Sequence, residues 1–337
     1  MAEPNDVEAT DGDDEDAIVD ALETAYLRAS GFAANDCAYL GQRYSQRWGY
    51  RVRDSESWLL RHVPGDAGGA LISHHHPSDT RYADVWLSPG RRVFVADATL
   101  RCVHSATLTS GQPDAWARTA LPMAVQGVFG LADDFVLAWG GAGATFPMAR
   151  FDGREWAVIA DPGFEVYAVH GVTPDHLVAV GDAGQVARFD GARWARCPTP
   201  VSEVLVGVFM ASPDEVYVTG ARGALLEGSL GGFGQIAQAE AHGAFPLLDV
   251  AWWQGQLWVA GGRLGLLRRV GRSDALEVVD NGMLGTGSGP TRLDARRDLV
   301  VTYRDRVAGT ADGEAWTHFG RDSLEETYEG KRLHFYR

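Results

Sequence analysis

The segment GDAGQVARFDGARW, residues 181–194, decides the fold of this chain. It combines a glycine-rich turn, a short apolar run, an Asp-Gly pair and a tryptophan. An Asp-Gly pair between β-prone residues is a strong hairpin signal, because a type I′ turn needs positive φ at both central positions. The same order of residues occurs in MARFDGREW at 148–156, and Asp-Gly followed by tryptophan returns at 312–316. A short β unit is therefore repeated along the chain.

The length of the repeat follows from a second, independent feature. A turn precedes a β-prone run in SPDEVYVTG at 212–220 and in TPDHLVAVG at 173–181. Six turns of this kind are marked by Gly90, Asp133, Asp175, Asp214, Gly255 and Arg297, which lie 43, 42, 39, 41 and 42 residues apart. An interval of about 40 residues holds four short strands, which is the size of one β-propeller blade. Because a single blade cannot bury both of its apolar faces, we expect the blades to stack around a ring.

We therefore predict an all-β protein, a β-propeller over residues 40–337 with about seven four-stranded blades. Seven large residues close the repeats: Trp58, Trp116, Trp156, Trp194, Phe233, Leu276 and Trp316. Six blades are the alternative if the first of these does not belong to a blade. We expect a C-terminal strand at 331–336 to join N-terminal strands at 43–62 in one shared blade that closes the ring, and residues 62–81 to form an insertion in the second blade.

The first 31 residues differ from the repeats. Residues 1–16 contain eight acidic side chains and no basic one, which predicts a disordered acidic tail over 1–15. Apolar residues then recur at helical spacing up to Gly31, namely Ile18, Val19, Leu22, Tyr26 and Leu27. This spacing predicts a short amphipathic helix over 16–31.

The composition excludes several classes of function. The chain has 337 residues with 45 acidic and 30 basic side chains, a net charge of -15. Because nucleic acids and anionic membranes bind basic surfaces, we expect neither as a partner. No apolar run is long enough to span a membrane, and the N-terminus lacks the features of a secretory signal. Three widely spaced cysteines suit a reducing compartment, so we expect a cytoplasmic protein.

The repeat resembles that of a known superfamily. Its order of strand, Gly-x-x-Gly turn, strand, Phe-Asp-Gly and Trp is similar to bacterial propellers with Asp-box (BNR-like) and WD/YVTN-like repeats. The resemblance covers about residues 82–318, is strongest at 125–225, and implies a propeller fold. The Asp-box signature of sialidases is Ser-x-Asp-x-Gly-x-x-Trp, whereas Asp and Gly are adjacent at 152–153 and at 190–191. A glycosidase activity is therefore not implied.

Few residues qualify as functional candidates. His74, His75 and His76 are consecutive, and because neighbours on a strand point to opposite faces they are a poor ligand set for one metal. Trp253 follows Trp252 where a strand meets a turn, and an exposed aromatic residue there would suit an interface. We take these three histidines and Trp253 as candidate partner contacts. The sequence shows no catalytic set, and we expect no metal and no cofactor.

These observations favour a binding module over an enzyme. We expect a propeller that acts as a scaffold or neutralising subunit of a bacterial assembly or effector system. Its partner would be a protein with a basic surface, given the charge of -15. Two alternatives stay open: a hydrolase or lyase that acts on a glycan or small molecule at the central funnel, and a glycan-binding lectin with one site per blade.

Overall fold

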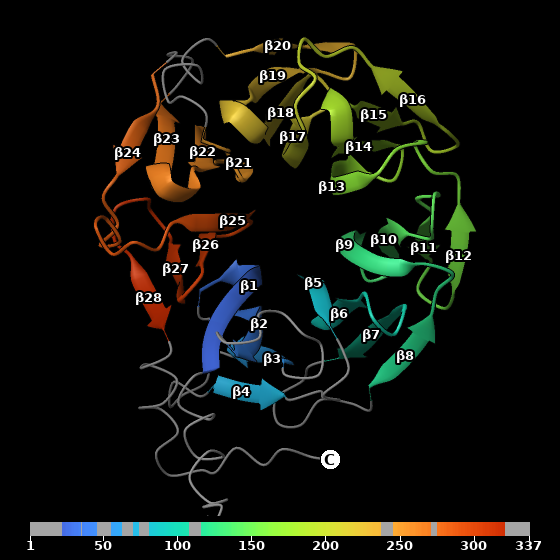
Figure 1. The fold of residues 1–337 in the computed structure, drawn as a ribbon, viewed down its shortest axis with the longest axis horizontal. Coiled ribbons are helices and arrows are strands. Elements are labelled where there is room, and N and C mark those ends of the chain that lie inside the picture. The colour runs from blue at the N-terminus through green and yellow to red at the C-terminus, as the bar shows by residue number, and fades with distance from the viewer. Residues whose placement is uncertain are drawn as a thin grey trace, which may run out of the picture.

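The computed structural model describes residues 22–34, 36–45, 55–62, 70–73, 81–107, 116–236, 245–270 and 275–320. The strands in these ranges form seven four-stranded antiparallel sheets. Figure 1 shows the sheets as blades around a common centre, with the chain passing from each blade to the next. The prediction of an all-β propeller built from four-stranded blades is confirmed.

The strands of the first four sheets have the following bounds. The first sheet contains β1 (Leu22–Ala33), β2 (Asp36–Ser45), β3 (Ser55–His62) and β4 (Ala70–Ser73). The second contains β5 (Tyr82–Leu87), β6 (Arg92–Asp97), β7 (Cys102–Thr107) and β8 (Ala117–Ala120). The third contains β9 (Ala124–Ala132), β10 (Phe135–Gly141), β11 (Met148–Phe151) and β12 (Trp156–Ile159). The fourth contains β13 (Val166–Thr173), β14 (His176–Gly181), β15 (Val186–Phe189) and β16 (Trp194–Cys197).

Three further sheets complete the ring. The fifth contains β17 (Leu205–Ser212), β18 (Glu215–Gly220), β19 (Leu225–Ser229) and β20 (Gly232–Gln235). The sixth contains β21 (Asp249–Trp253), β22 (Gln256–Ala260), β23 (Leu266–Val270) and β24 (Glu277–Val279). The seventh contains β25 (Pro290–Ala295), β26 (Leu299–Tyr303), β27 (Arg306–Thr310) and β28 (Thr317–Gly320).

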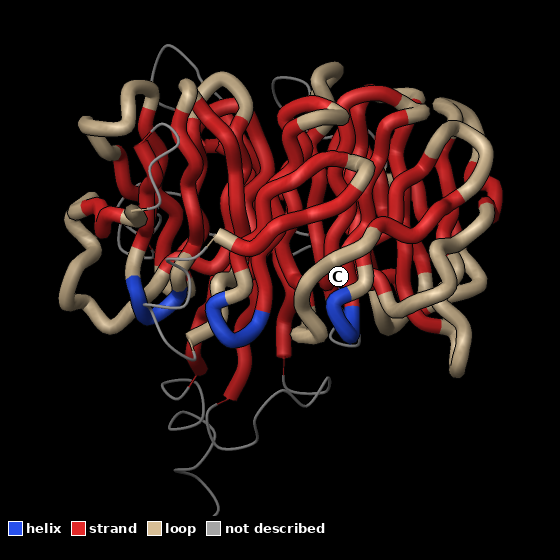
Figure 2. The backbone as a smooth tube through the Cα atoms, turned by 90° about the horizontal axis from the view of Figure 1, so that it is seen from above, coloured by secondary structure: helices blue, strands red, loops and turns tan. Residues whose placement is uncertain are grey.

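Each blade has the same internal order. The first strand lies nearest the centre of the ring and the fourth at its periphery (Figure 1). Short 3-10 turns connect the second and third strands of blades four, five and six: η2 (Asp182–Gly184), η3 (Ala221–Gly223) and η5 (Gly262–Leu264). Figure 2 shows these three turns on one rim of the molecule, so the loops that leave the second strands share one face of the ring.

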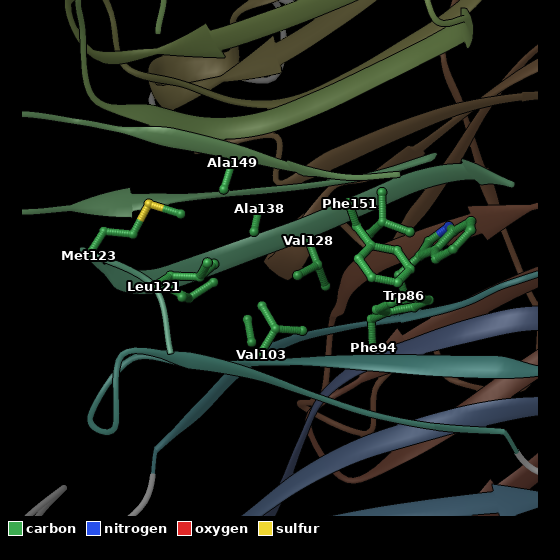
Figure 3. Packing of buried hydrophobic residues seen from close by; sticks show 12 residues of the cluster. Trp86, Phe94, Val103, Leu121, Met123, Val128, Ala138, Ala149 and Phe151 are labelled. Atoms are coloured by element: carbon green, nitrogen blue, oxygen red, sulfur yellow. The ribbon is translucent and has the colours of Figure 1, made fainter. Parts of the chain in front are cut away.

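The closing tryptophans pack against the preceding blade. Trp156 of blade three contacts the ring of Phe94 in blade two, with centroids 6.4 Å apart. Trp316 of blade seven lies 6.1 Å from Trp258 of blade six. Figure 3 shows the layer between blades two and three, where side chains of both sheets interlock. Each blade therefore buries its apolar face only in the presence of a neighbour, as expected of a repeat that does not fold alone.

The Asp-Gly pairs form turns of a different type from the one predicted. Asp190 Oδ1 accepts hydrogen bonds from the N–H groups of Ala192 and Arg193, at 3.0 and 2.9 Å. In this pair only Gly191 has a positive φ, of 91°. The turn is therefore not type I′, because the aspartate side chain satisfies the loop N–H groups and only the glycine needs the left-handed region.

The predicted helix over 16–31 is wrong for residues 22–31, which belong to strand β1. An innermost strand contacts neighbours on both sides, so consecutive residues such as Ala29 and Ser30 are both buried. A register shift between Tyr26 and Arg28 further interrupts the alternation of period two. Both effects imitate helical spacing in the sequence. Residues 1–21, with the predicted tail, lie outside the described residues.

Gly31 has a role other than ending a helix. A Cβ atom at this position would lie 2.1 Å from Cys37 Cβ and 2.4 Å from the Asp36 carbonyl oxygen. The glycine therefore permits the close approach of β1 and β2 in the first hairpin.

Contacts between the first and seventh blades close the described ring. The N–H of Ala29 donates to Thr302 Oγ1 at 2.9 Å, and the N–H of Asp298 donates to the Phe32 carbonyl oxygen at 2.9 Å. The predicted C-terminal strand at 331–336 lies outside the described residues, so its place in a shared blade stays a prediction. Strand β4, within the stretch expected as an insertion, is the fourth strand of the first sheet.

Candidate binding site in the central channel

A cavity lies at the centre of the ring. It has a volume of about 250 Å³, and its walls include residues from the innermost strand of every blade, β1, β5, β9, β13, β17, β21 and β25. Each blade therefore contributes to one shared site, and the strand register shows which residues occupy equivalent positions.

One layer of the channel divides into a charged side and a side of small residues. The strand register places equivalent residues of blades one to seven in this layer, each paired with a buried residue of the second strand: Arg28, Asp84, Gly127, Ala168, Gly207, Asp249 and Arg292. Blades six, seven, one and two thus contribute Asp, Arg, Arg and Asp in sequence around the ring. Blades three, four and five contribute only glycine or alanine.

The next layer is aromatic on the side where the first layer is small. Its residues in blades one to seven are Ser30, Trp86, Phe129, His170, Phe209, Ala251 and Asp294. The imidazole of His170 lies between two rings, 5.0 Å from Phe129 and 4.3 Å from Phe209. The channel therefore has an aromatic wall opposite a charged wall.

Polar side chains in these layers tie neighbouring blades together. Each accepts a hydrogen bond from a backbone N–H on the innermost strand of the next blade. The pairs are Ser30 with Leu87 (3.1 Å), Asp84 with Val128 (3.1 Å), His170 with Met210 (3.1 Å), Asp249 with Leu293 (2.9 Å) and Asp294 with Gly31 (3.1 Å). These residues therefore have a structural role, because unpaired backbone N–H groups in the buried centre would destabilise the ring.

The two buried carboxylates of the first layer accept hydrogen bonds from the backbone. Asp84 Oδ1 accepts from the N–H of Val85 at 2.9 Å and lies 3.1 Å from Arg28 Nε. Asp249 Oδ1 likewise accepts from the N–H of Val250 at 2.9 Å. Burial raises the pKa of both carboxyls, against the lowering effect of Arg28 and Arg292. Both oxygens of each carboxylate therefore accept a hydrogen bond from the protein backbone.

His170 is neutral at physiological pH. Burial lowers the pKa of its imidazole to about 4. Its Nδ1 accepts the hydrogen bond from Met210, so the neutral ring carries its proton on Nε2. His170 therefore offers a donor on Nε2 but has no lone pair available for general-base catalysis.

A second polar cluster lies in blade two, away from the channel. His104 Nε2 lies 3.0 Å from Asp97 Oδ2 and 3.4 Å from Cys102 Sγ. Asp97 Oδ1 accepts from the N–H groups of Thr99 and Leu100, at 3.0 and 2.8 Å. These three side chains could offer one metal ligand atom each, but all are at most 1% exposed. Burial raises the pKa of Cys102 to about 12, so its thiol stays protonated. These hydrogen bonds fit a structural role, in which the cluster stabilises the turn between β6 and β7.

Of the residues chosen from the sequence, Trp253 is described by the structure, and it does not line this cavity. Trp253 is 5% exposed, packs in the layer between blades six and seven, and donates from Nε1 to the Arg297 carbonyl oxygen at 3.3 Å. The exposure expected of Trp253 is therefore wrong, because the adjacent blade covers its ring. His74, His75 and His76 lie outside the described residues.

The repeated aspartates occupy the turns where the sequence placed them. Asp152, Asp190 and Asp312 each accept two N–H groups of their own loop. In contrast, Arg28, Asp84, Asp249 and Arg292 were not found from the sequence. Their signal is a charged residue within an apolar innermost strand, but only the strand register brings these positions together.

No protein-family model matches the chain, and no curated protein matches it as a relative. Solved structures share its fold. YCF48 bound to D1 peptide has a TM-score of 0.60 and 13% identity, over 84% of this chain and 92% of that chain. Catalytically inactive virginiamycin B lyase from Staphylococcus aureus with quinupristin has a TM-score of 0.59 and 13% identity, over 73% and 86%.

The WD40 β-propeller domain of Doa1 is a third similar structure, with a TM-score of 0.59 and 8% identity over 86% of this chain and 94% of that chain. At such low identities these structures establish the propeller fold and no shared activity. Among the residues described, none of the helices has the length and apolar character needed to cross a bilayer.

Proposed function

We propose that this protein is a non-catalytic propeller that binds a protein partner with a basic surface. It would act in the cytoplasm as a scaffold or neutralising subunit of a bacterial assembly or effector system. The net charge of -15 favours a basic partner. The three cysteines are buried and free, which fits a reducing compartment.

One observation favours a binding function over an enzymatic one. At the centre of the ring, both buried carboxylates of the first layer and Nδ1 of His170 already accept hydrogen bonds from the backbone of the ring. General acid–base catalysis needs such a group to be within reach of the substrate and free to exchange a proton. These three side chains instead accept hydrogen bonds that join neighbouring blades.

The similar propeller structures are consistent with either a binding protein or an enzyme. YCF48 is solved with a D1 peptide, and virginiamycin B lyase is solved with quinupristin. The same scaffold thus serves protein binding and catalysis, and the choice depends on the site. A lectin with one site per blade is not favoured, because the aromatic residues at equivalent positions, such as Phe129 and Phe209, line a single cavity.

Affinity purification tests the proposal. The tagged full chain is isolated from native lysate at low salt, co-purifying proteins are identified, and binding of the strongest candidate is reconstituted from purified components. We expect a partner with a basic surface whose dissociation constant rises with salt concentration, because opposite charges attract across the interface. A chain that stays alone at every salt concentration, or a reconstituted complex that is indifferent to salt, contradicts the proposal.

A further inference from the structure

The central cavity is rich in free hydrogen-bond donors and has few free acceptors. Among the described residues, the Arg28 guanidinium contacts Asp84 only through Nε, and Arg292 donates only from Nη1, to the Leu248 carbonyl oxygen at 3.0 Å. Both side chains line the cavity, and that of Arg28 is 28% exposed. The remaining guanidinium N–H groups of these two lining residues therefore have no acceptor among the described residues.

The carboxylates in and beside this cavity already accept hydrogen bonds from the protein. Asp84 and Asp249 each accept hydrogen bonds on both carboxylate oxygens. Asp294 accepts from Arg296 on both oxygens and also from the N–H of Gly31. These carboxylates are thus already paired within the protein, whereas a ligand with an anionic acceptor would pair with guanidinium N–H groups that have no acceptor among the described residues.

Arg296 is not part of this free donor set. Besides Asp294, its guanidinium donates to the Leu87 carbonyl oxygen and to Ser30 Oγ, and it lies over the rings of Phe32 and Trp86. All of its Nη groups are engaged in ring closure. The anion site is thus limited to Arg28 and Arg292, which occupy equivalent positions on adjacent blades.

The aromatic wall opposite the two arginines indicates the chemistry of the rest of the ligand. Phe129, Phe209 and the neutral imidazole of His170 form an aromatic surface, and Trp139 lies behind it at the position of Gly127. An inorganic anion would leave this wall exposed to water, and an uncharged apolar molecule would leave the arginines unpaired. A volume of about 250 Å³ is below the range of roughly 300–1,000 Å³ for drug-sized ligands, and suits a group the size of one aromatic amino acid.

We propose that the central cavity binds an organic carboxylate with an aromatic or apolar body, its carboxylate on Arg28 and Arg292 and its body against Phe129, His170 and Phe209. The geometry permits two sources of this group, a free small-molecule acid or the C-terminal carboxylate of a peptide. The inference does not depend on the proposed protein partner, which would engage the outside of the molecule through charge.

Calorimetric titration of the full chain tests this site. The probes are phenylacetate with phenylacetamide, a short peptide ending in phenylalanine as free acid and as amide, and inorganic phosphate. We expect the acid to bind at least about tenfold more tightly than its amide, because only the acid forms charge-assisted hydrogen bonds with the arginines. Binding of phenylacetate identifies a small-molecule source, and binding of the peptide acid alone identifies a peptide source.

Matched variants locate the binding. Arg292→Gln should weaken binding of the acid at least about tenfold, and Arg292→Lys should restore part of it, because lysine keeps the charge without the two-pronged geometry. Arg154→Gln removes an equal charge from an exposed turn of blade three and should leave the affinity unchanged. Thermal unfolding of each variant establishes that it is folded.

Several results would overturn the inference. These are equal binding of acid and amide, absence of binding by every organic acid, tighter binding of phosphate than of the acids, or unchanged affinity in a folded Arg292→Gln variant. Co-purification of a protein partner would be unaffected by such results, so the two proposals can fail separately.

Discussion

At the scale of single residues, His170 links the stability of the ring to pH. Its folded-state pKa of about 4 lies below the value of about 6.5 expected in the unfolded chain. As pH falls below about 6.5, the unfolded state gains a proton that the folded state does not take up. The stabilising contribution is therefore present above pH 6.5 and is lost as pH falls towards 4.

The variant His170→Gln tests this linkage. Glutamine can still accept the N–H of Met210 through its amide oxygen, but it does not titrate. The difference in free energy of unfolding between variant and wild type should shift by about 1.4 kcal/mol in favour of the variant for each pH unit between about 6.5 and 4. Urea denaturation at pH 7.5, 5.5 and 4.5 measures it. A difference that does not vary with pH would show that His170 is not buried in its neutral form.

At the scale of elements, two substitutions can separate the effect of steric crowding in the β1–β2 hairpin from the general effect of replacing a glycine by alanine. Gly31→Ala places a Cβ atom 2.1 Å from Cys37 Cβ, which should destabilise the protein by about 1–3 kcal/mol through forced backbone shifts. Gly141→Ala, at the end of β10, is the control, because its nearest neighbour would be 3.9 Å away. Chemical denaturation compares them, and equal effects of the two substitutions would argue against the β1–β2 pairing.

The sequence predicted the elements that carry local signals. The Asp-Gly turns, the Pro-Asp turns and the closing tryptophans such as Trp156 are determined within a few residues, because turn chemistry and a large side chain act locally. Strand β1 was mistaken for a helix, because its burial depends on blades two and seven, which lie far away in the sequence. Secondary-structure patterns do not encode such non-local contacts.

The candidate site was missed for a related reason. Asp84 and Asp249 lie in the strands YADVWL and DVAWW, where one charged residue interrupts an apolar run. That interruption is visible in the sequence. The sequence does not reveal what these charged residues do, because only the strand register places both of them in one layer with Arg28 and Arg292. A site shared by all blades therefore appears only at the level of the assembled ring.

At the scale of the whole molecule, the ring depends on the seam between its first and last described blades. Asp294 of blade seven accepts the N–H of Gly31 in blade one and pairs with Arg296. Arg296 in turn donates to Ser30 of blade one and to the Leu87 carbonyl oxygen of blade two. Three blades thus meet in one network, and opening the ring at this seam exposes several buried polar groups at once.

Arg296→Gln should therefore destabilise the ring as a unit. Removing the guanidinium leaves the carboxylate of Asp294, which is 12% exposed as a side chain, without its charged partner, and loss of one member of such a buried pair costs about 3–5 kcal/mol. Arg193→Gln is the control, because Arg193 is 83% exposed in its pair with Asp190 and a surface pair contributes about 0–1 kcal/mol. Stopped-flow denaturation should show faster unfolding for Arg296→Gln only. If both variants unfold at the wild-type rate, the network does not hold the seam, and closure must come from elsewhere in the chain, such as the predicted strand at 331–336.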